Sequence, residues 1–327
     1  VVVLLRAWAR RQSYTVTVKA LLISCIVFSL HNVDFAFLRD QPEAAPLGFT
    51  IALLIICALS ISAPASVFEQ LARREARSAV EVDTARSIQT RLLPSDDVVP
   101  ELEFVCHMRP ASQVGGDYFD IHRTPGRQWF FVGDVTGHGL GAGLVTLMAQ
   151  SIIQSILKTH PDITPRELNT IANRALCENL LRLGEQRHMT IVSICHLSAG
   201  RFVLSGSHDN IYVYRAARRE VEIVPIVHFP LGLGFLDALN DVGELGLELR
   251  EGDLLFVGTD GITEAARGGD EQKELFGEPG LVAFLTELGQ RPLAELKARL
   301  IERLESFTGG VYHDDVAFIM LRTRRPA

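Results

Sequence analysis

Two apolar segments stand out in the hydrophobic pattern near the start of the chain. Residues 44–68 carry no charged side chain over 25 positions, which is long enough to cross a bilayer as a helix. Residues 20–30 form a shorter apolar run that reaches spanning length only together with its flanks. We therefore predict a membrane anchor over residues 1–68, with two transmembrane helices at about 15–38 and 45–67.

Each apolar segment has an alternative interpretation. A buried helix of a soluble protein would also be apolar over residues 44–68, and a signal peptide would explain residues 20–30 because basic residues precede them. The hairpin agrees with the positive-inside rule, since basic residues flank it on both sides. These are Arg6, Arg10, Arg11 and Lys19 before the first segment and Arg73, Arg74 and Arg77 after the second. We expect a multi-pass protein of the inner (cytoplasmic) membrane whose catalytic domain faces the cytoplasm.

The next stretch, residues 69–94, is charged, lacks glycine and ends at Pro94, a pattern typical of a helix that stops before proline. Apolar or small residues recur there every seven positions, which favours a homodimer through a coiled coil. The recurring residues are Leu71, Ser78, Ala85 and Leu92. Because Ser and Ala make a weak seam, a solvated linker helix is the alternative.

After Pro94 the pattern changes to short apolar runs separated by turns, which predict about nine strands. The runs are 102–108, 128–134, 189–197, 201–206, 210–215, 221–226, 247–250, 253–260 and 315–321. Helical patterns cover 141–158, 165–183, 279–289 and 292–307. Because several strands follow one another without a helix between them, we predict an α+β fold for residues 95–327, a layered β-sandwich flanked by helices.

Charge and cysteine content exclude two classes of function. The net charge of −7 argues against a protein that binds nucleic acid through a broad basic face. The five cysteines form no CxxC motif and are odd in number, so neither a disulfide framework nor a zinc site is indicated. We expect Cys106, Cys177 and Cys195 to be buried core residues in a reducing compartment.

Four aspartates are the candidates for chemistry, because each lies at the end of an apolar run or in a glycine-flanked turn. They are Asp117, Asp134, Asp260 and Asp314. Taken singly, each is more often a turn residue or a helix cap. Gathered in one cleft, they would repel one another unless divalent cations neutralised them, and carboxylate oxygens suit Mg²⁺ or Mn²⁺.

The order of the motifs resembles the SpoIIE/RsbU-type bacterial serine/threonine phosphatases, a branch of the metal-dependent type 2C (PPM) phosphatases. The resemblance spans residues 86–321. It rests, in chain order, on IQTRLLP, GGDYFD, GDVTGHGLGAGLVTLM, SGSHDNIYVYR, PLGLG, DGITEA, LFGEPGL and HDDVAFI. It implies metal-dependent hydrolysis of phosphoserine or phosphothreonine on a partner protein, with a phosphorylated anti-sigma-factor antagonist as the expected substrate.

The resemblance also implies roles for individual residues. Asp134 would bridge two Mn²⁺ or Mg²⁺ ions with the Val135 carbonyl as a further ligand, Asp260 and Asp314 would complete one metal, and Asp117 would act through ligation or a metal-bound water. The ions would activate a water that attacks phosphorus in line. Around these ligands, Gly116, Gly261, His138 and Asp315 are candidates for supporting contacts. Asp315 could replace Asp314 as the ligand, and His138 could donate a proton or shape its loop.

Two rival functions remain open. The GGDYF motif is similar to the GGDEF turn of diguanylate cyclases, but Tyr118 replaces the second acid and the other motifs do not belong to that class. A pseudophosphatase that binds a phosphoprotein without hydrolysis is the second alternative. It is favoured by Ala317, where the resembling family often has Thr, and by SGSHDN in place of AGHNP.

Overall fold

The computed structural model describes residues 16–38, 41, 43, 45–92, 94, 97–99, 102–111, 114–137, 139–198, 200–226, 243–270 and 274–323. The chain divides into two compact units, Val1–Glu81 and Val82–Ala327. The predicted features that lie outside the described residues are Arg6, Arg10, Arg11, His138 and the PLGLG motif at 230–234.

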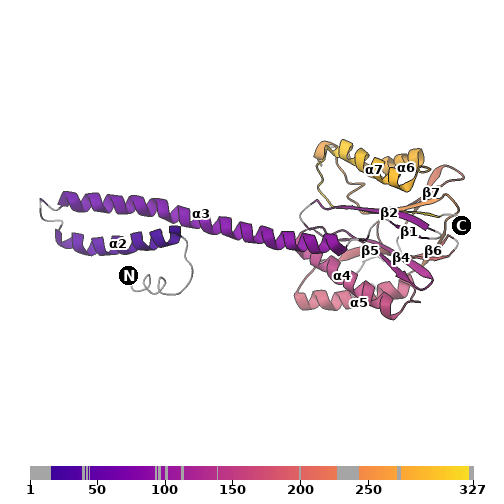
Figure 1. The fold of residues 1–327 in the computed structure, drawn as a ribbon, viewed down its shortest axis with the longest axis horizontal. Coiled ribbons are helices and arrows are strands. Elements are labelled where there is room, and N and C mark those ends of the chain that lie inside the picture. Colours follow the sequence, from indigo (N-terminus) through magenta and orange to yellow (C-terminus); the bar gives the residue numbers. More distant parts are fainter. Residues whose placement is uncertain are drawn as a thin grey trace. The chain divides into compact units, whose positions relative to one another are not determined.

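Two helices account for the described part of the first unit (Figure 1). Helix α2 covers Val16–Leu38, and α3 runs without a break over Ala45–Leu92, through both the predicted second span and the predicted linker. The Thr17 hydroxyl of α2 contacts the Glu69 carboxylate of α3. By length and composition Ala45–Arg77 could cross a membrane, whereas the apolar part of α2, Thr17–Val33, is shorter. The anchor and linker boundaries stay predictions.

Two antiparallel sheets build the second unit. The six-stranded sheet has the order β1-β2-β11-β10-β7-β8, and the five-stranded sheet has the order β3-β4-β5-β6-β9. The strands of the first are β1 Asp97–Val99, β2 Leu102–Arg109, β7 Ile211–Arg215, β8 Glu220–Val224, β10 Leu254–Gly258 and β11 Val316–Thr323. The strands of the second are β3 Tyr118–Thr124, β4 Arg127–Val135, β5 Met189–Ser198, β6 Arg201–Ser207 and β9 Leu245–Glu248.

Helices cover the outer face of each sheet, with α4 and α5 on one side of the sandwich and α6 and α7 on the other (Figure 1). They comprise α4 Leu140–Thr159, α5 Pro165–Leu183, α6 Gly277–Leu288 and α7 Leu293–Thr308, with a short 3₁₀ turn, η2, at Arg267–Gly269. Thr164 and Glu167 form a reciprocal capping box that starts α5. The predicted layered α+β sandwich is therefore confirmed.

Alternation along the strands explains the layers. In β4, Phe130 and Val132 point into the core between the sheets, while Trp129 and Phe131 point into the core under α4 and α5. Helix α4 is itself long and apolar enough to pass for a membrane span, but close to half of it is buried against the sheet. The three cysteines predicted to be core residues are buried.

Candidate metal centre

Four chain segments bring the predicted aspartates to the same end of the sandwich. Asp134 lies near the end of β4, opposite Thr190 of β5, and Asp117 immediately precedes β3. On the other sheet, Asp260 follows β10 by two residues and Asp314 precedes β11 by two. Because both sheets contribute strand ends, the site depends on how the two sheets stack rather than on any local motif.

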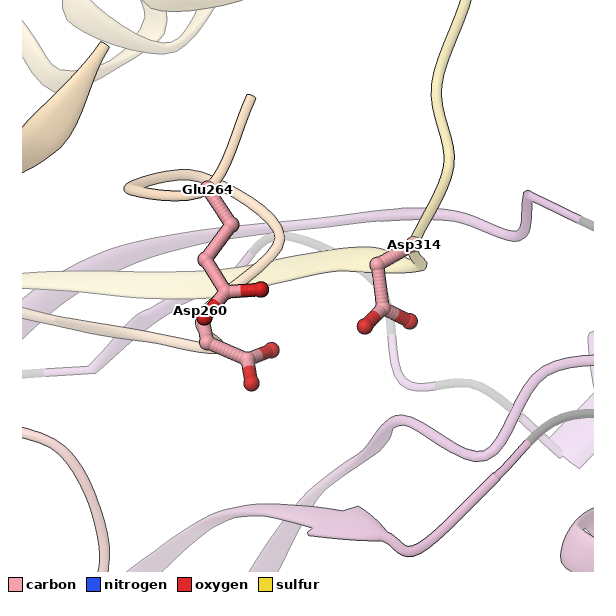
Figure 2. A group of neighbouring side chains, drawn as sticks. All are labelled: Asp260, Glu264 and Asp314. Atoms are coloured by element: carbon pink, nitrogen blue, oxygen red, sulfur yellow. The ribbon is translucent and has the colours of Figure 1, made fainter. Parts of the chain in front are cut away.

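A group of three carboxylates, from the half-buried Asp260 and the exposed Glu264 and Asp314, forms the part of this site nearest to solvent. One oxygen from each lies within 4.8 Å of the others, and Figure 2 shows the side chains converging from the turn after β10 and from the segment before β11. Glu264 was not among the predicted site residues. It lies one helical turn after Asp260, and its backbone N–H donates to the Asp260 carbonyl at 2.7 Å. Its position in the DGITEA motif, four residues after Asp260, was the available signal.

Asp117 forms the buried part of the site. Its side chain is 1% exposed, and its Oδ2 accepts a hydrogen bond from the Thr259 hydroxyl at 2.7 Å. Burial, followed by the charge of Asp134, raises the pKa of Asp117 well above its ordinary value. Thr259, which sequence reasoning missed, therefore orients a carboxylate from the opposite sheet.

Asp134 interacts electrostatically with both the buried Asp117 and the three-carboxylate group. Burial, and then the charges of Asp260 and Asp314, raises the pKa of Asp134 to about 8. Burial and the charge of Asp314 raise the pKa of Asp260 to about 6. These shifts have a common physical cause, since several carboxylates share a partly desolvated space with too little compensating positive charge.

Asp315 has a different environment from its neighbour Asp314. Asp315 is 2% exposed and accepts hydrogen bonds from the backbone N–H groups of Ala111 and Gly116, each at 2.6 Å. Asp314 is exposed and belongs to the three-carboxylate group. The geometry therefore favours Asp314 as the metal ligand. Asp315 instead fixes the backbone of the loop before Asp117 through its two hydrogen bonds.

The predicted glycines lie where a side chain has no room. A Cβ on Gly116 would come within 2.8 Å of the Val135 and Gly137 carbonyl oxygens, and one on Gly261 within 1.9 Å of the Asp315 carbonyl oxygen. The Gly116 carbonyl also accepts from the Val135 N–H at 3.3 Å. These close approaches pack the Asp117 loop against β4 and the Asp260 turn against the start of β11.

One contact links the end of helix α3 to this site. The Gln89 side chain is buried, its Nε2 donates to the Gly115 carbonyl at 3.0 Å, and its Oε1 accepts from the Gly115 N–H at 3.2 Å. Gly115 adjoins Gly116, whose N–H is held by Asp315. Gln89 was not predicted as a site residue, although it belongs to the IQTRLLP motif.

Of the two histidines considered near the site, the structure describes His208 but not His138. The ring of His208 contacts the Thr190 hydroxyl at 3.3 Å and the Gly258 carbonyl at 3.2 Å, so it bridges the two sheets. Burial lowers the pKa of His208, which favours the neutral ring and a structural role.

The residues present fit divalent cations. All the converging side chains offer hard oxygen donors, and the Asp260 Oδ1 atom is buried without a hydrogen-bond partner among the described residues. An orphaned buried carboxylate oxygen is costly unless a cation or a donor satisfies it. Asp260, Glu264 and Asp314 are therefore the side chains whose oxygens lie close enough together to hold a metal ion. Asp134 is not in this group, but the charges of Asp260 and Asp314 act on it.

A known protein family matches most of the second unit of the chain. The family model described as Stage II sporulation protein E (SpoIIE) matches residues 124–324, which include Asp134, Asp260 and Asp314 but not Asp117. No curated protein sequence matches significantly.

Solved structures share the fold. The SiaA-PP2C domain of Pseudomonas aeruginosa aligns with a TM-score of 0.65 at 20% identity, over 76% of this chain and 98% of that one. The RsbU and RsbW domains of a Mycobacterium tuberculosis protein give 0.60 at 22% identity, over 72% and 64%. The catalytic domain of the phosphatase PstP, in complex with two manganese ions, gives 0.51 at 16% identity, over 68% and 98%. Since the family model covers more than half of the chain, the chain belongs to the SpoIIE family, and its fold is that of the PP2C-type serine/threonine phosphatases, as its motifs predicted.

Proposed function

We propose that this chain hydrolyses phosphoserine or phosphothreonine on a partner protein, using two Mn²⁺ or Mg²⁺ ions. The observation that carries the proposal is the convergence of Asp260, Glu264 and Asp314, whose charges act on Asp134, within the part of the chain that matches the SpoIIE family. The manganese ions in PstP, which has the same fold, support the choice of metal. Bound there, the ions would supply Lewis acidity and lower the pKa of a coordinated water.

Some residues of the chain would hold the ions, and others would position the residues around them. Asp134, Asp260 and Asp314 would hold the ions, with the Val135 carbonyl as a further ligand and Glu264 as an additional carboxylate. Thr259 would orient Asp117, and Asp315 would keep the Gly116 backbone in place through its 2.6 Å hydrogen bond. Holding these groups rigidly lowers the reorganisation that the transition state would otherwise require.

The partner is proposed to be a phosphorylated anti-sigma-factor antagonist. The motif order and the likeness to a structure that contains RsbU and RsbW domains support this choice. A protein substrate also agrees with the exposure of Asp314 and Glu264, since an open site admits a loop of another protein. No nucleic acid is expected, given the net charge of −7.

We also propose a membrane anchor of two helices with the phosphatase domain in the cytoplasm, and regulation through the helical linker. Helix α3 extends from the apolar segment to Gln89, which makes both of its hydrogen bonds to Gly115. A change in the position or pairing of this helix would therefore act on the loop that carries Asp117. A homodimer through residues 69–94 is one way to produce such a change.

The test of the function is phosphate release from an aryl phosphate by the full chain in detergent, with Mn²⁺ and then with a chelator. Asp134→Asn should lower turnover by at least about a hundredfold while the protein keeps its circular dichroism spectrum, because the change removes a charge and little packing. Asp162→Asn, at an exposed aspartate in the middle of the α4–α5 connection, is the matched control.

Retained activity in Asp134→Asn would contradict the assignment of the site. No release by the folded wild-type chain, despite Mn²⁺ binding, would favour the pseudophosphatase alternative. That alternative draws on Ala317, which is fully buried and bonds to Thr259 through its backbone N–H and carbonyl, with no side-chain hydroxyl to offer.

A further inference from the structure

A small cavity opens directly beside the metal centre. Its volume is about 250 Å³, and its walls come from the start of β7, the end of β10 with the following turn, and the first turns of α6. Asp260 and Glu264 line this cavity and also belong to the carboxylate group of the metal centre. A substrate whose phosphoryl group lay at the metal centre would therefore place a neighbouring side chain within reach of the cavity.

The size and lining of the cavity suit one long polar side chain. It is smaller than the roughly 300–1,000 Å³ of typical small-molecule sites. Its walls contain Asp209 and Glu278 in addition to the two shared carboxylates, and the described residues that line it include no lysine or arginine. Neither Asp209 nor Glu278 takes part in an ion pair among the described residues. A cationic side chain would find two carboxylates that the metal group does not use.

Glu278 is held in position by the wall of the cavity. Its Oε2 accepts a hydrogen bond from Asn210 Nδ2 at 2.9 Å and another from the Tyr212 hydroxyl at 3.3 Å. Both donors come from the start of β7, and Glu278 itself lies in the first turn of α6, so two rigid elements fix the carboxylate. Since both bonds end on Oε2, the Oε1 atom accepts no hydrogen bond from the described residues and can accept one from a ligand. A carboxylate already held in place binds a ligand with little further loss of entropy.

We propose that Glu278 is a specificity-determining residue, which selects substrates carrying a lysine or arginine side chain close to the phosphorylated serine or threonine. The inference rests on the proposed function, because it concerns a residue next to the phosphate in the same substrate. Glu278 acts on substrate choice through charge and position, while the metal ligands act on the phosphoryl group.

Phosphoserine peptides test the proposal with the full chain in detergent and Mn²⁺. The peptides are compared in pairs that differ at one residue, which is lysine in one peptide and the uncharged norleucine in the other. Successive pairs place this residue at each position on either side of the phosphoserine. At one position or more, wild type should show kcat/KM about tenfold higher for the lysine peptide. Glu278→Gln, which keeps an acceptor for Asn210 and Tyr212, should bring this ratio close to one. Glu278→Lys should reverse the charge preference, so that a peptide with glutamate at this position has a higher kcat/KM than the lysine peptide.

Glu287→Gln is the matched control, since Glu287 lies at the far end of α6 and pairs with Arg303 at 3.0 Å. Its lysine preference should equal that of wild type. Metal-dependent turnover without a lysine preference at any position, or a preference that Glu278→Gln retains, would overturn this inference and leave the phosphatase assignment intact. Absence of turnover on both the aryl phosphate and the peptides would overturn both.

Discussion

The side chain of Gln89 and the backbone of Gly115 form a closed pair of hydrogen bonds, at 3.0 Å and 3.2 Å, between helix α3 and the loop that carries Asp117. The Gln89 side chain thereby satisfies both backbone groups of Gly115, as a neighbouring β-strand would. Because both residues are buried, their polar groups cannot form hydrogen bonds with water instead when the contact is broken.

Gln89→Ala should therefore weaken the site as well as the fold. The Gly115 N–H and carbonyl would lose their partners, which costs about 1–3 kcal/mol of unfolding free energy for each unsatisfied group. We expect lower Mn²⁺ affinity in titration calorimetry and a lower rate of phosphate release. Arg91→Ala, at an exposed position near the end of the same helix, serves as the control. Wild-type Mn²⁺ affinity in Gln89→Ala would show that the loop does not depend on this contact.

The Thr259 hydroxyl leads to a second prediction. It donates to Asp117 at 2.7 Å and accepts from the Ala317 N–H at 3.0 Å, so it ties the two sheets together at the metal centre. Thr259→Val should weaken Mn²⁺ binding by about 10- to 100-fold, the usual cost of losing a group that orients a ligand. Thr259→Ser keeps the hydroxyl and should recover most of the affinity. Equal affinities for the valine and serine variants would rule out the hydroxyl as the cause.

The raised pKa of Asp134 predicts how stability depends on pH in the absence of metal. The folded protein keeps a proton on Asp134 up to about pH 8, whereas an unfolded chain loses it near the ordinary aspartate pKa of about 4. The folded state thus binds more protons in this window, so the contribution to stability is complete below about pH 4 and is lost as pH rises to about 8.

Thermal unfolding in the presence of a chelator measures this dependence. The melting temperature of the wild-type chain should fall between about pH 5 and about pH 8, and Asp134→Asn, which cannot titrate at this position, should fall less. Added Mn²⁺ should reduce the decline in wild type, since a cation compensates the carboxylate charge. A parallel decline in the two proteins would show that Asp134 titrates normally.

The proposed membrane topology is tested by reporter fusions. Gln41 lies between α2 and α3, and the hairpin predicts that a reporter there is external, whereas one after Ala327 is cytoplasmic. A periplasmic enzyme reporter and a fluorescent protein that matures only in the cytoplasm give opposite signals at the two sites. Cytoplasmic fluorescence at both positions would remove the hairpin.

Much of the fold was predictable because its signals are local. The apolar runs at 128–134 and 189–197 lie within β4 and β5, and the helical patterns at 165–183 and 292–307 correspond to α5 and α7. Strand β3 was missed, since GGDYFD was interpreted only as a turn before an aspartate, although Tyr118 and Phe119 begin a strand that pairs with β4.

What the sequence determined by itself was which carboxylates stand at strand ends and to which family their motifs belong, because alternation, glycine turns and motif order are properties of short segments. Only the tertiary structure decided that Asp314 faces Asp260 and Glu264 while Asp315 turns to the Gly116 loop, and that Thr259 and Gln89 support the site. The Thr259–Asp117 contact joins residues 142 positions apart, and the Asp315–Gly116 contact joins residues 199 apart. Such pairs are set by how two sheets stack through their shared core, a relationship that no local periodicity encodes.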